Sequence, residues 1–341
     1  MGVRELSPAY FGMVMATGIV AVAAHLGHMP RVAGALFKLN VAIYGALVLL
    51  NAVRAARHRR EFAADLVDHL RGPGFFTWVA ATAVLGAQFI LQAGDYRAGQ
   101  ALAVLAGALW FAFTYLIFAA FTVKEQKPAL DQGINGAWLL AVVATQSIAV
   151  LAALLAPQAG AQRLALDFLA LSLWLFGGML YIWMMTLIFY RYTFFRLAPG
   201  DLTPPYWINM GAMAISTLAG ALLVMNAATA PFLQSLLPFL KGFTVFYWAA
   251  GTWWIPMLLV LGVWRYGIKR FPLRYDPLYW GAVFPLGMYG VGTHEMALAL
   301  GLDFLAVVPR AFLWAALLAW GAAFAGWAAA MLIRPGRRPR G

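Results

Sequence analysis

The chain is dominated by long apolar segments that alternate with short polar or basic segments. Ten of the apolar segments have roughly 20 residues or more, the length that an α-helix needs to cross a hydrocarbon core of about 30 Å. The composition agrees, because 64% of the residues are hydrophobic and 11% are charged, whereas a soluble domain carries about 25% charged residues. The sequence therefore predicts an all-α polytopic membrane protein.

The ten expected membrane helices follow one another without a linker or a shift in composition, which predicts a single domain over residues 1–341. The first segment could be taken for a signal peptide, but its length and the preceding Glu5 favour a retained helix. The expected ranges are 8–26, 32–55, 74–91, 98–123, 136–156, 164–190, 206–226, 237–263, 277–300 and 308–333.

The basic residues indicate the orientation of these helices. If the N-terminus is cytoplasmic, 18 of the 24 Lys and Arg residues fall in cytoplasmic segments. Cytoplasmic loops of membrane proteins carry such an excess, so we expect both termini in the cytoplasm and an inner (plasma) membrane location. The net charge of +12 then reflects membrane orientation, and no nucleic-acid partner is expected. Short outer loops predict five helical hairpins embedded in the lipid bilayer.

Residues 57–70 lie between the second and third helices and combine basic residues with an apolar spacing. Phe62, Leu66 and Leu70 recur every four residues beside a polybasic run. This pattern predicts a short interfacial helix on the cytoplasmic leaflet. A simple stop-transfer anchor is the plainer alternative.

The ninth helix contains a proline about two turns after its start. Pro285 removes a backbone hydrogen bond and should bend the helix, and such a break in hydrocarbon survives only beside protein or a water-filled cavity. Phe284 stands at the bend, flanked by Gly281 and Gly287. The arrangement indicates an aromatic ring at the constriction of a pore, although ordinary packing of the ring remains the alternative.

Few ionisable residues fall inside the expected helices. His294 and Glu295 could form a proton-coupling pair, or they could simply meet water near the outer end of the ninth helix. Lys38, Lys241 and Arg310 could reach outward to water, or they could form an electropositive outer vestibule for anions. A path without buried carboxylates suits small anions better than cations.

Signatures of other chemistries are absent from the sequence. The chain has no cysteine, no phosphate loop and no nucleophile elbow. His25 and His28 could share a helix face and bind metal or haem, but no second pair accompanies them. We therefore expect no cofactor, no metal site and no enzyme activity, and a membrane-embedded enzyme would require a converging catalytic set that the sequence does not display.

The odd-numbered helices carry more small and polar residues, whereas the even-numbered ones are heavier in Trp, Phe and Leu. This alternation predicts an inner ring of odd helices within an outer, lipid-facing ring. Candidates for the pore lining are Thr17, Gly18, Thr82, Gln146, Ser147, Asn209, Gly211 and Gly281.

Four segments, in order along the chain, resemble the tellurite-resistance/dicarboxylate transporter family of the voltage-dependent slow anion channel type. They are residues 11–19, 143–147, 207–220 and 280–286. The resemblance implies ten helices arranged as five hairpins about a pseudo-fivefold axis, a phenylalanine gate at Phe284 and a homotrimer with one pore per subunit. The resemblance also adds Met210 to the candidates for the pore lining. Two helices depart from the family pattern: the seventh reads Gly211-Ala212-Met213 where some members have proline, and the fifth has no internal proline.

These observations predict transport of small anions through a central pore that Phe284 gates, with monovalent anions or C4-dicarboxylates such as malate as substrates. The alternative is a proton-coupled C4-dicarboxylate carrier, or a tellurite-resistance exporter, that uses His294 and Glu295.

Overall fold

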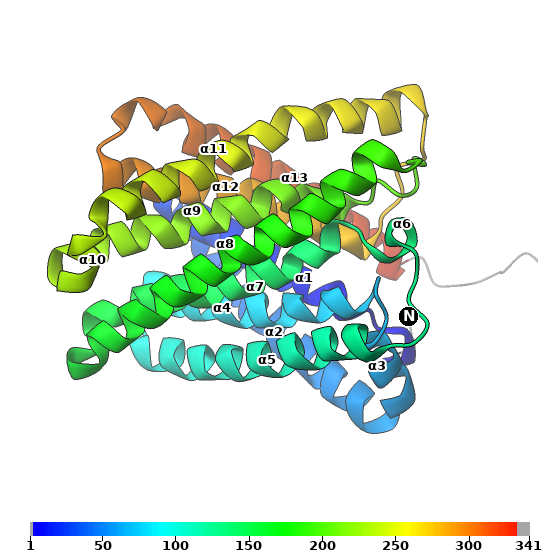
Figure 1. Cartoon of the computed structure of the whole chain (residues 1–341), viewed down its shortest axis with the longest axis horizontal. Helices are drawn as coiled ribbons and strands as arrows, with labels where there is room; N and C mark the ends of the chain where they lie inside the picture. Colours follow the sequence, from blue (N-terminus) through cyan, green and yellow to red (C-terminus); the bar gives the residue numbers. More distant parts are fainter. Residues whose placement is uncertain (1–2, 333–341) are drawn as a thin grey trace, which may run out of the picture.

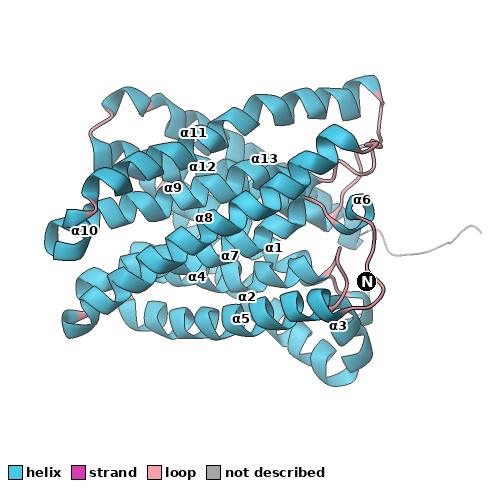
Figure 2. Ribbon diagram, in the orientation of Figure 1, coloured by secondary structure: helices cyan, strands magenta, loops and turns pink. Residues whose placement is uncertain are grey.

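A computed structural model describes residues 3–332, and every regular element within that range is a helix (Figure 2). Ile333 and the tail 334–341, which hold the predicted end of the last helix and four of the arginines, lie outside the described residues.

Ten helices of residues 3–332 have 15 residues or more, and they run side by side (Figure 1). Their burial and contacts divide them into an inner and an outer layer. The inner helices are α1 (Gly12–Leu26), α4 (Phe76–Ala93), α7 (Leu140–Leu155), α9 (Ile208–Asn226) and α12 (Trp280–Leu300). The outer helices are α2 (Pro30–Arg57), α5 (Tyr96–Val123), α8 (Arg163–Phe194), α11 (Leu237–Gly262) and α13 (Val307–Leu332). Three short helices are α3 (Arg59–Leu66), α6 (Leu130–Gly133) and α10 (Pro231–Ser235).

Burial separates the two layers. In the spans that contain α1, α4, α7 and α9, 83% to 94% of the most apolar stretch is buried, against 17% to 22% for α2, α5, α11 and α13 and 56% for α8. The inner helices contact one another in the closed order α1, α4, α7, α9, α12 and back to α1. Each outer helix packs on the inner helix of its own hairpin and on one further inner helix. Counted in order among the ten long helices, the first, third, fifth, seventh and ninth thus lie inside and the others lie outside.

The described residues contain nine helices that are long and apolar enough to cross a membrane. Helix α12 is not among them, although its 21 residues lie within the inner layer. Its four glycines, Pro285, His294 and Glu295 lower its hydropathy. Length and composition therefore support a polytopic membrane protein with nine candidate spans, one fewer than the ten that we expect.

All five inner helices begin in the same manner. A 3₁₀ turn precedes each one: Pro8–Phe11, Gly72–Phe75, Gly136–Leu139, Pro204–Trp207 and Pro277–Tyr279. The side chains of Ser7, Asn135 and Asp276 accept hydrogen bonds from free backbone N–H groups at three of these starts. Each inner helix is the first helix of its hairpin, so all five inner helices run in the same direction. Their N-termini therefore lie at one end of the molecule.

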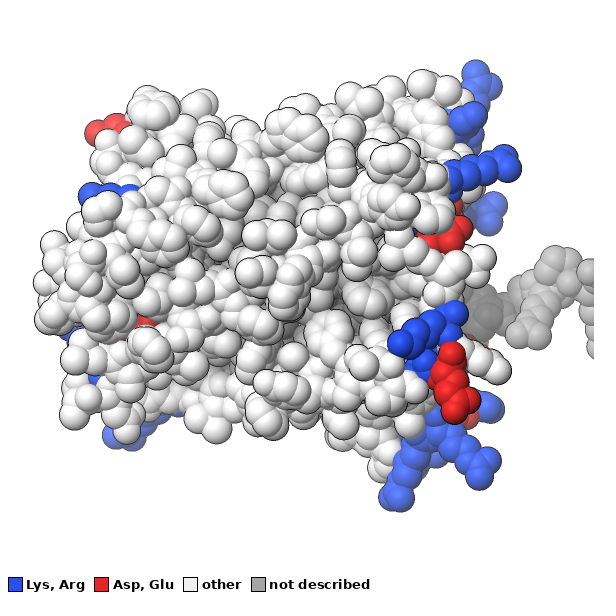
Figure 3. Space-filling view, viewed as in Figure 1, with Lys and Arg blue, Asp and Glu red and all other residues white. Residues whose placement is uncertain are grey.

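The charged residues gather at that same end, near the N-terminus, α3 and α6 (Figure 3). The middle of the visible face is almost free of charge, and few charged side chains mark the opposite end. We name these the basic end and the far end. The uncharged belt is the surface that a hydrocarbon layer would cover.

The predicted interfacial segment contains α3, which packs on the body of the protein. The ring of Phe62 meets that of Phe75 edge-on with 5.0 Å between centroids. Asp65 is buried and holds Arg54 at 2.5 Å and Arg71 at 2.6 Å. Tertiary contacts therefore hold the segment, in addition to any contact with lipid.

Candidate conduction pathway

A cavity of about 300 Å³ opens at the basic end, where the five inner helices begin. We name it the vestibule. Its wall includes one residue near the start of each inner helix: Gly12, Thr77, Leu140, Ile208 and Gly281. Five helix N-termini converge on it, and each carries a partial positive charge that favours anions. Its ionisable side chains are Glu5, Asp276 and Arg71, so the helix dipoles, and not a net side-chain charge, favour anions there.

A second cavity, of about 130 Å³, lies between the same five helices farther from the basic end. We name it the apolar cavity. Its lining forms three rings with one residue from each inner helix: Ile19, Val84, Ser147, Ile215 and Met288; then Val22, Ala87, Val150, Leu218 and Val291; then Leu26, Leu91, Leu154, Leu222 and Glu295. Within every helix the rings are separated by three and then four residues, the spacing of one helix face.

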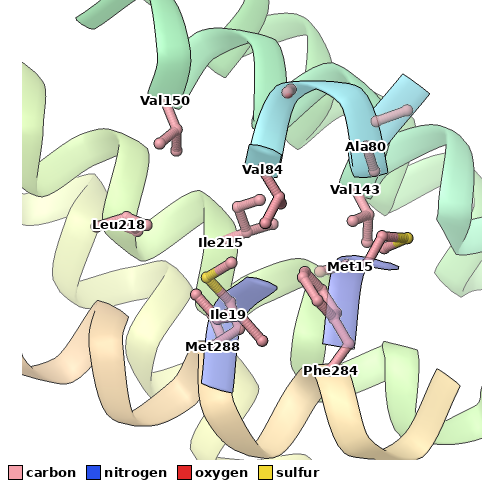
Figure 4. Packing of buried hydrophobic residues seen from close by; sticks show 14 of the residues in the cluster. Met15, Ile19, Ala80, Val84, Val143, Val150, Ile215, Leu218, Phe284 and Met288 are labelled. Atoms are coloured by element: carbon pink, nitrogen blue, oxygen red, sulfur yellow. The ribbon is translucent and has the colours of Figure 1, made fainter. Parts of the chain in front are cut away.

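Phe284 stands between the two cavities. It lines the vestibule together with Met15, whereas Ile19 and Met288, one turn farther along α1 and α12, line the apolar cavity. Ala80, Val143 and Gly211 occupy the equivalent register in α4, α7 and α9. Figure 4 shows the Phe284 ring beside Met15, with Ala80 and Val143 on the facing helices. The ring is 1% exposed, and its neighbours one helical turn farther along line the apolar cavity.

Helices α9 and α12 approach each other closely near this layer. A Cβ atom on Gly211 would lie 2.7 Å from Cγ of Pro285, and one on Gly292 would lie 2.6 Å from the Ala214 carbonyl oxygen. Side chains at these two glycines would force the helices apart. Pro285 also deprives α12 of one backbone hydrogen bond beside Phe284.

Most of the polar residues expected to line the path instead join the inner helices to the outer ones. Thr17 accepts a hydrogen bond from the Trp320 indole at 3.0 Å. Thr82 bonds to Tyr44 at 2.8 Å, and Gln146 donates to the Trp174 carbonyl oxygen at 3.0 Å. Asn209 faces Tyr192 on α8 at 3.4 Å. A polar group in a low-dielectric interior needs a partner, and the neighbouring outer helix supplies it.

The small and apolar candidates divide between the helix interfaces and the walls of the two cavities. Gly18 belongs to an interface, because a Cβ atom there would lie 2.5 Å from Cγ1 of Val84 and 2.9 Å from Nδ2 of Asn40. The Met210 carbonyl oxygen faces Gly251 on α11. Ser147 lines the apolar cavity, and Gly281 lines the vestibule.

His294 and Glu295 point to different spaces. Glu295 lines the apolar cavity, whereas His294 lines a separate cavity between α1, α12 and α13. Adjacent residues of a helix project about 100° apart, so the two cannot act as a face-to-face pair. Within residues 3–332, no three His, Cys, Asp or Glu side chains come together as metal ligands.

Sequence reasoning missed the apolar residues of the three rings. The signal that could have found them is the identical spacing of +4, +7 and +11 from Met15, Ala80, Val143, Gly211 and Phe284. It becomes visible only once the inward face of each helix is known.

A two-layer helical membrane protein whose inner helices enclose two cavities in series belongs to the channel and transporter class. The voltage-dependent anion channel family (SLAC1) matches residues 5–328, and the chain belongs to this family. This confirms the family resemblance that the sequence motifs indicate.

Curated relatives agree with that assignment. The "uncharacterized membrane protein Rv1735c" of Mycobacterium tuberculosis is 41% identical over 145 residues, which cover 42% of this chain and 73% of that protein. The "uncharacterized transporter MJ0762" of Methanocaldococcus jannaschii is 24% identical over 324 residues, 93% of this chain and 92% of that protein. Family and relatives together support transport of anions across a membrane by a multi-pass protein.

Proposed function

We propose that the inner helices form a pseudo-fivefold ring, the fifth pair being α12 and α13, around a path for small anions that is closed by Phe284. The observation that carries this proposal is the lining of the path: all five inner helices contribute equivalent positions to successive rings, and the series is interrupted where Phe284 lies. Membership of an anion channel family supports the same assignment.

Phe284 suits a gate because it is the largest residue in its ring, beside Met15, Val143 and Ala80. Its neighbour Pro285 leaves α12 one hydrogen bond short, which makes a hinge at this point less costly than elsewhere in the helix. Swinging the aromatic ring aside would join the vestibule to the apolar cavity. The gate is a movable side chain in an otherwise packed layer.

The substrate class follows from the lining. Helix N-termini attract anions into the vestibule, while the rings beyond it offer apolar side chains and the Ser147 hydroxyl. The desolvation cost of an ion grows with the square of its charge, so monovalent anions cross an apolar constriction more easily than divalent ones. Monovalent anions are therefore the favoured substrates, and C4-dicarboxylates such as malate are the competing class.

The test is the current carried by purified protein in proteoliposomes when one anion replaces another. Phe284→Ala should raise the anion conductance by about ten-fold or more, which corresponds to a barrier lowered by about 1.4 kcal/mol. The matched control is Phe76→Ala, because Phe76 is equally buried at 1% and its ring faces Phe118 on the outer helix α5. Equal conductance in the wild type and Phe284→Ala would reject the gate.

One observation favours a second function, a proton-coupled carboxylate carrier. Glu295 is the one carboxylate among the residues that line the apolar cavity, and a carboxyl group beside a transport path can carry a proton. In that case Glu295→Gln abolishes accumulation driven by a pH gradient. Currents that follow the anion gradient and the voltage alone would exclude coupling.

A further inference from the structure

A third cavity, of about 460 Å³, lies between the ends of α1, α12 and α13. We name it the side cavity. It stands at the far end, because α1 ends there and α13 begins there. Its polar lining comes from His28, His294 and Arg310, and Leu313 and Trp314 contribute part of its apolar wall.

The polar groups of the side cavity can all donate hydrogen bonds to an anion. Arg310 adds a permanent positive charge, and each histidine ring presents an N–H group. His28 is held at the cavity by an unusual backbone: it follows the last turn of α1 with φ of 58°, a left-handed conformation that side chains rarely adopt. Among residues 3–332, no carboxylate pairs with any of these three groups. The cavity thus holds the charge of Arg310, which no carboxylate in its wall neutralises.

The side cavity adjoins the proposed path. Leu26 and Val291 line both the side cavity and the apolar cavity, so their side chains form part of the wall between the two spaces. The outermost ring of the apolar cavity, along the axis, consists of four leucines and Glu295. A carboxylate opposes the straight axial exit of an anion, whereas the Arg310 guanidinium of the side cavity attracts it.

We propose that the side cavity is the far-end mouth of the path. In this arrangement a small anion leaves the apolar cavity between Leu26 and Val291, and is held by Arg310 with the two histidines before release. The inference rests on the proposed function, and it adds a binding site and a direction of exit. It also explains how an anion path can attract its substrate at the end of the molecule that carries few charges.

The chain contains no cysteine, so single cysteines report local accessibility without background. Ala306 lines the side cavity and is exposed, and Ser235 on α10 is an exposed reference. The first measurement compares how fast a sulfonate-bearing and a trimethylammonium-bearing thiosulfonate react with Ala306→Cys and with Ser235→Cys. The anionic reagent should be favoured about ten-fold at position 306 relative to 235, because a charged cavity concentrates counter-ions.

A second substitution assigns that preference to the cavity. Arg310→Gln should abolish most of the preference at position 306, whereas Lys241→Gln, which removes an exposed charge from α11 outside this cavity, should leave it intact. Equal reagent preference at positions 306 and 235 would overturn the proposed site, because it would mean that the cavity does not concentrate anions.

The exit route is tested in a conducting Phe284→Ala background. Leu26 lines both cavities, whereas Leu91 belongs to the same ring but lines only the apolar cavity. Sulfonate reagent added from the far side should block current through Leu26→Cys about ten-fold faster than through Leu91→Cys. Equal blocking rates would establish a straight axial exit. They would overturn the side mouth and leave the proposed function standing. A Phe284→Ala protein without anion current would contradict the proposed function itself, and the mouth with it.

Discussion

Asp65 organises the charges of the basic end. Its carboxylate pairs with Arg54, whose side chain is 1% exposed, and with the half-exposed Arg71. Asp65→Asn leaves a buried guanidinium without its counter-ion, so the free energy of unfolding should fall by about 3–5 kcal/mol. Denaturant unfolding in detergent micelles measures it. Glu61→Gln is the control, because the Glu61–Arg4 pair is exposed to solvent and its loss should change little. Equal losses of unfolding free energy in the two variants would mean that the buried ion pairs of Asp65 do not stabilise the fold.

His69 should make the protein sensitive to acid. Burial, and then the nearby Lys124, lower the pKa of His69 below its usual value, and its ring stacks on Phe121 at 4.2 Å. The unfolded chain binds the proton more readily, so stability is complete above pH of about 6.5 and declines as the pH falls through the lower folded value.

His69→Phe tests that sensitivity, because it preserves the stacked ring and removes the titrating group. The thermal midpoint of the wild type should drop between pH of about 8 and about 5, and the drop should be smaller in His69→Phe. A variant that loses as much stability as the wild type would assign the acid sensitivity to other groups.

At the residue scale, the position of a side chain in its own helix can be predicted from the sequence, whereas its hydrogen-bond partner on another helix cannot. The bend expected at Pro285 directs attention to Phe284, which lines the vestibule; that the ring gates a path stays a prediction. Thr17 and Gln146 were expected on the path because polar residues in membrane helices often mark it. They serve instead as partners for the Trp320 indole and the Trp174 carbonyl oxygen, contacts that depend on which outer helix lies beside each inner one.

Among the elements, α9 and α12 are closely packed against each other. A methyl group on Gly292 would lie 2.6 Å from a backbone oxygen of α9, which cannot rotate away. Gly292→Ala should therefore destabilise the protein by about 1–3 kcal/mol, the usual cost of overpacking. Gly45 on α2 has no atom within 4 Å of its virtual Cβ, and Gly45→Ala should leave stability equal or slightly higher. The same unfolding assay compares both, and equal costs would refute the close packing.

At the element scale, composition and length located the helices well. The apolar segments end at charged or glycine-rich stretches, and left-handed Gly94 and Gly301 terminate α4 and α12 as glycine permits. The rotation of each helix could not be predicted. Apolar residues lie on every side of the inner helices, so periodicity does not distinguish the face toward Phe284 from the face toward an outer helix.

For the whole molecule, the two layers have different chemical tasks. The outer layer exposes large apolar side chains such as Phe111, Trp183 and Leu318, which suit a hydrocarbon environment. Several polar side chains of the inner layer bond to outer helices, and the cavity between the inner helices is lined mostly by apolar side chains. The proposed path would bind anions weakly, and weak binding is what rapid conduction requires.

The asymmetry of charge between the two ends predicts how the whole molecule is inserted. Lys and Arg are retained on the cytoplasmic side during membrane insertion, so the basic end, with the vestibule, should face the cytoplasm (Figure 3). Single cysteines in the cysteine-free chain report this: Ser235→Cys at the far end and Glu125→Cys in the exposed loop after α5. An impermeant maleimide should label Ser235→Cys in intact cells and Glu125→Cys only after the membrane is disrupted. The opposite pattern would place the vestibule outside and reverse the direction in which the five helix dipoles collect anions.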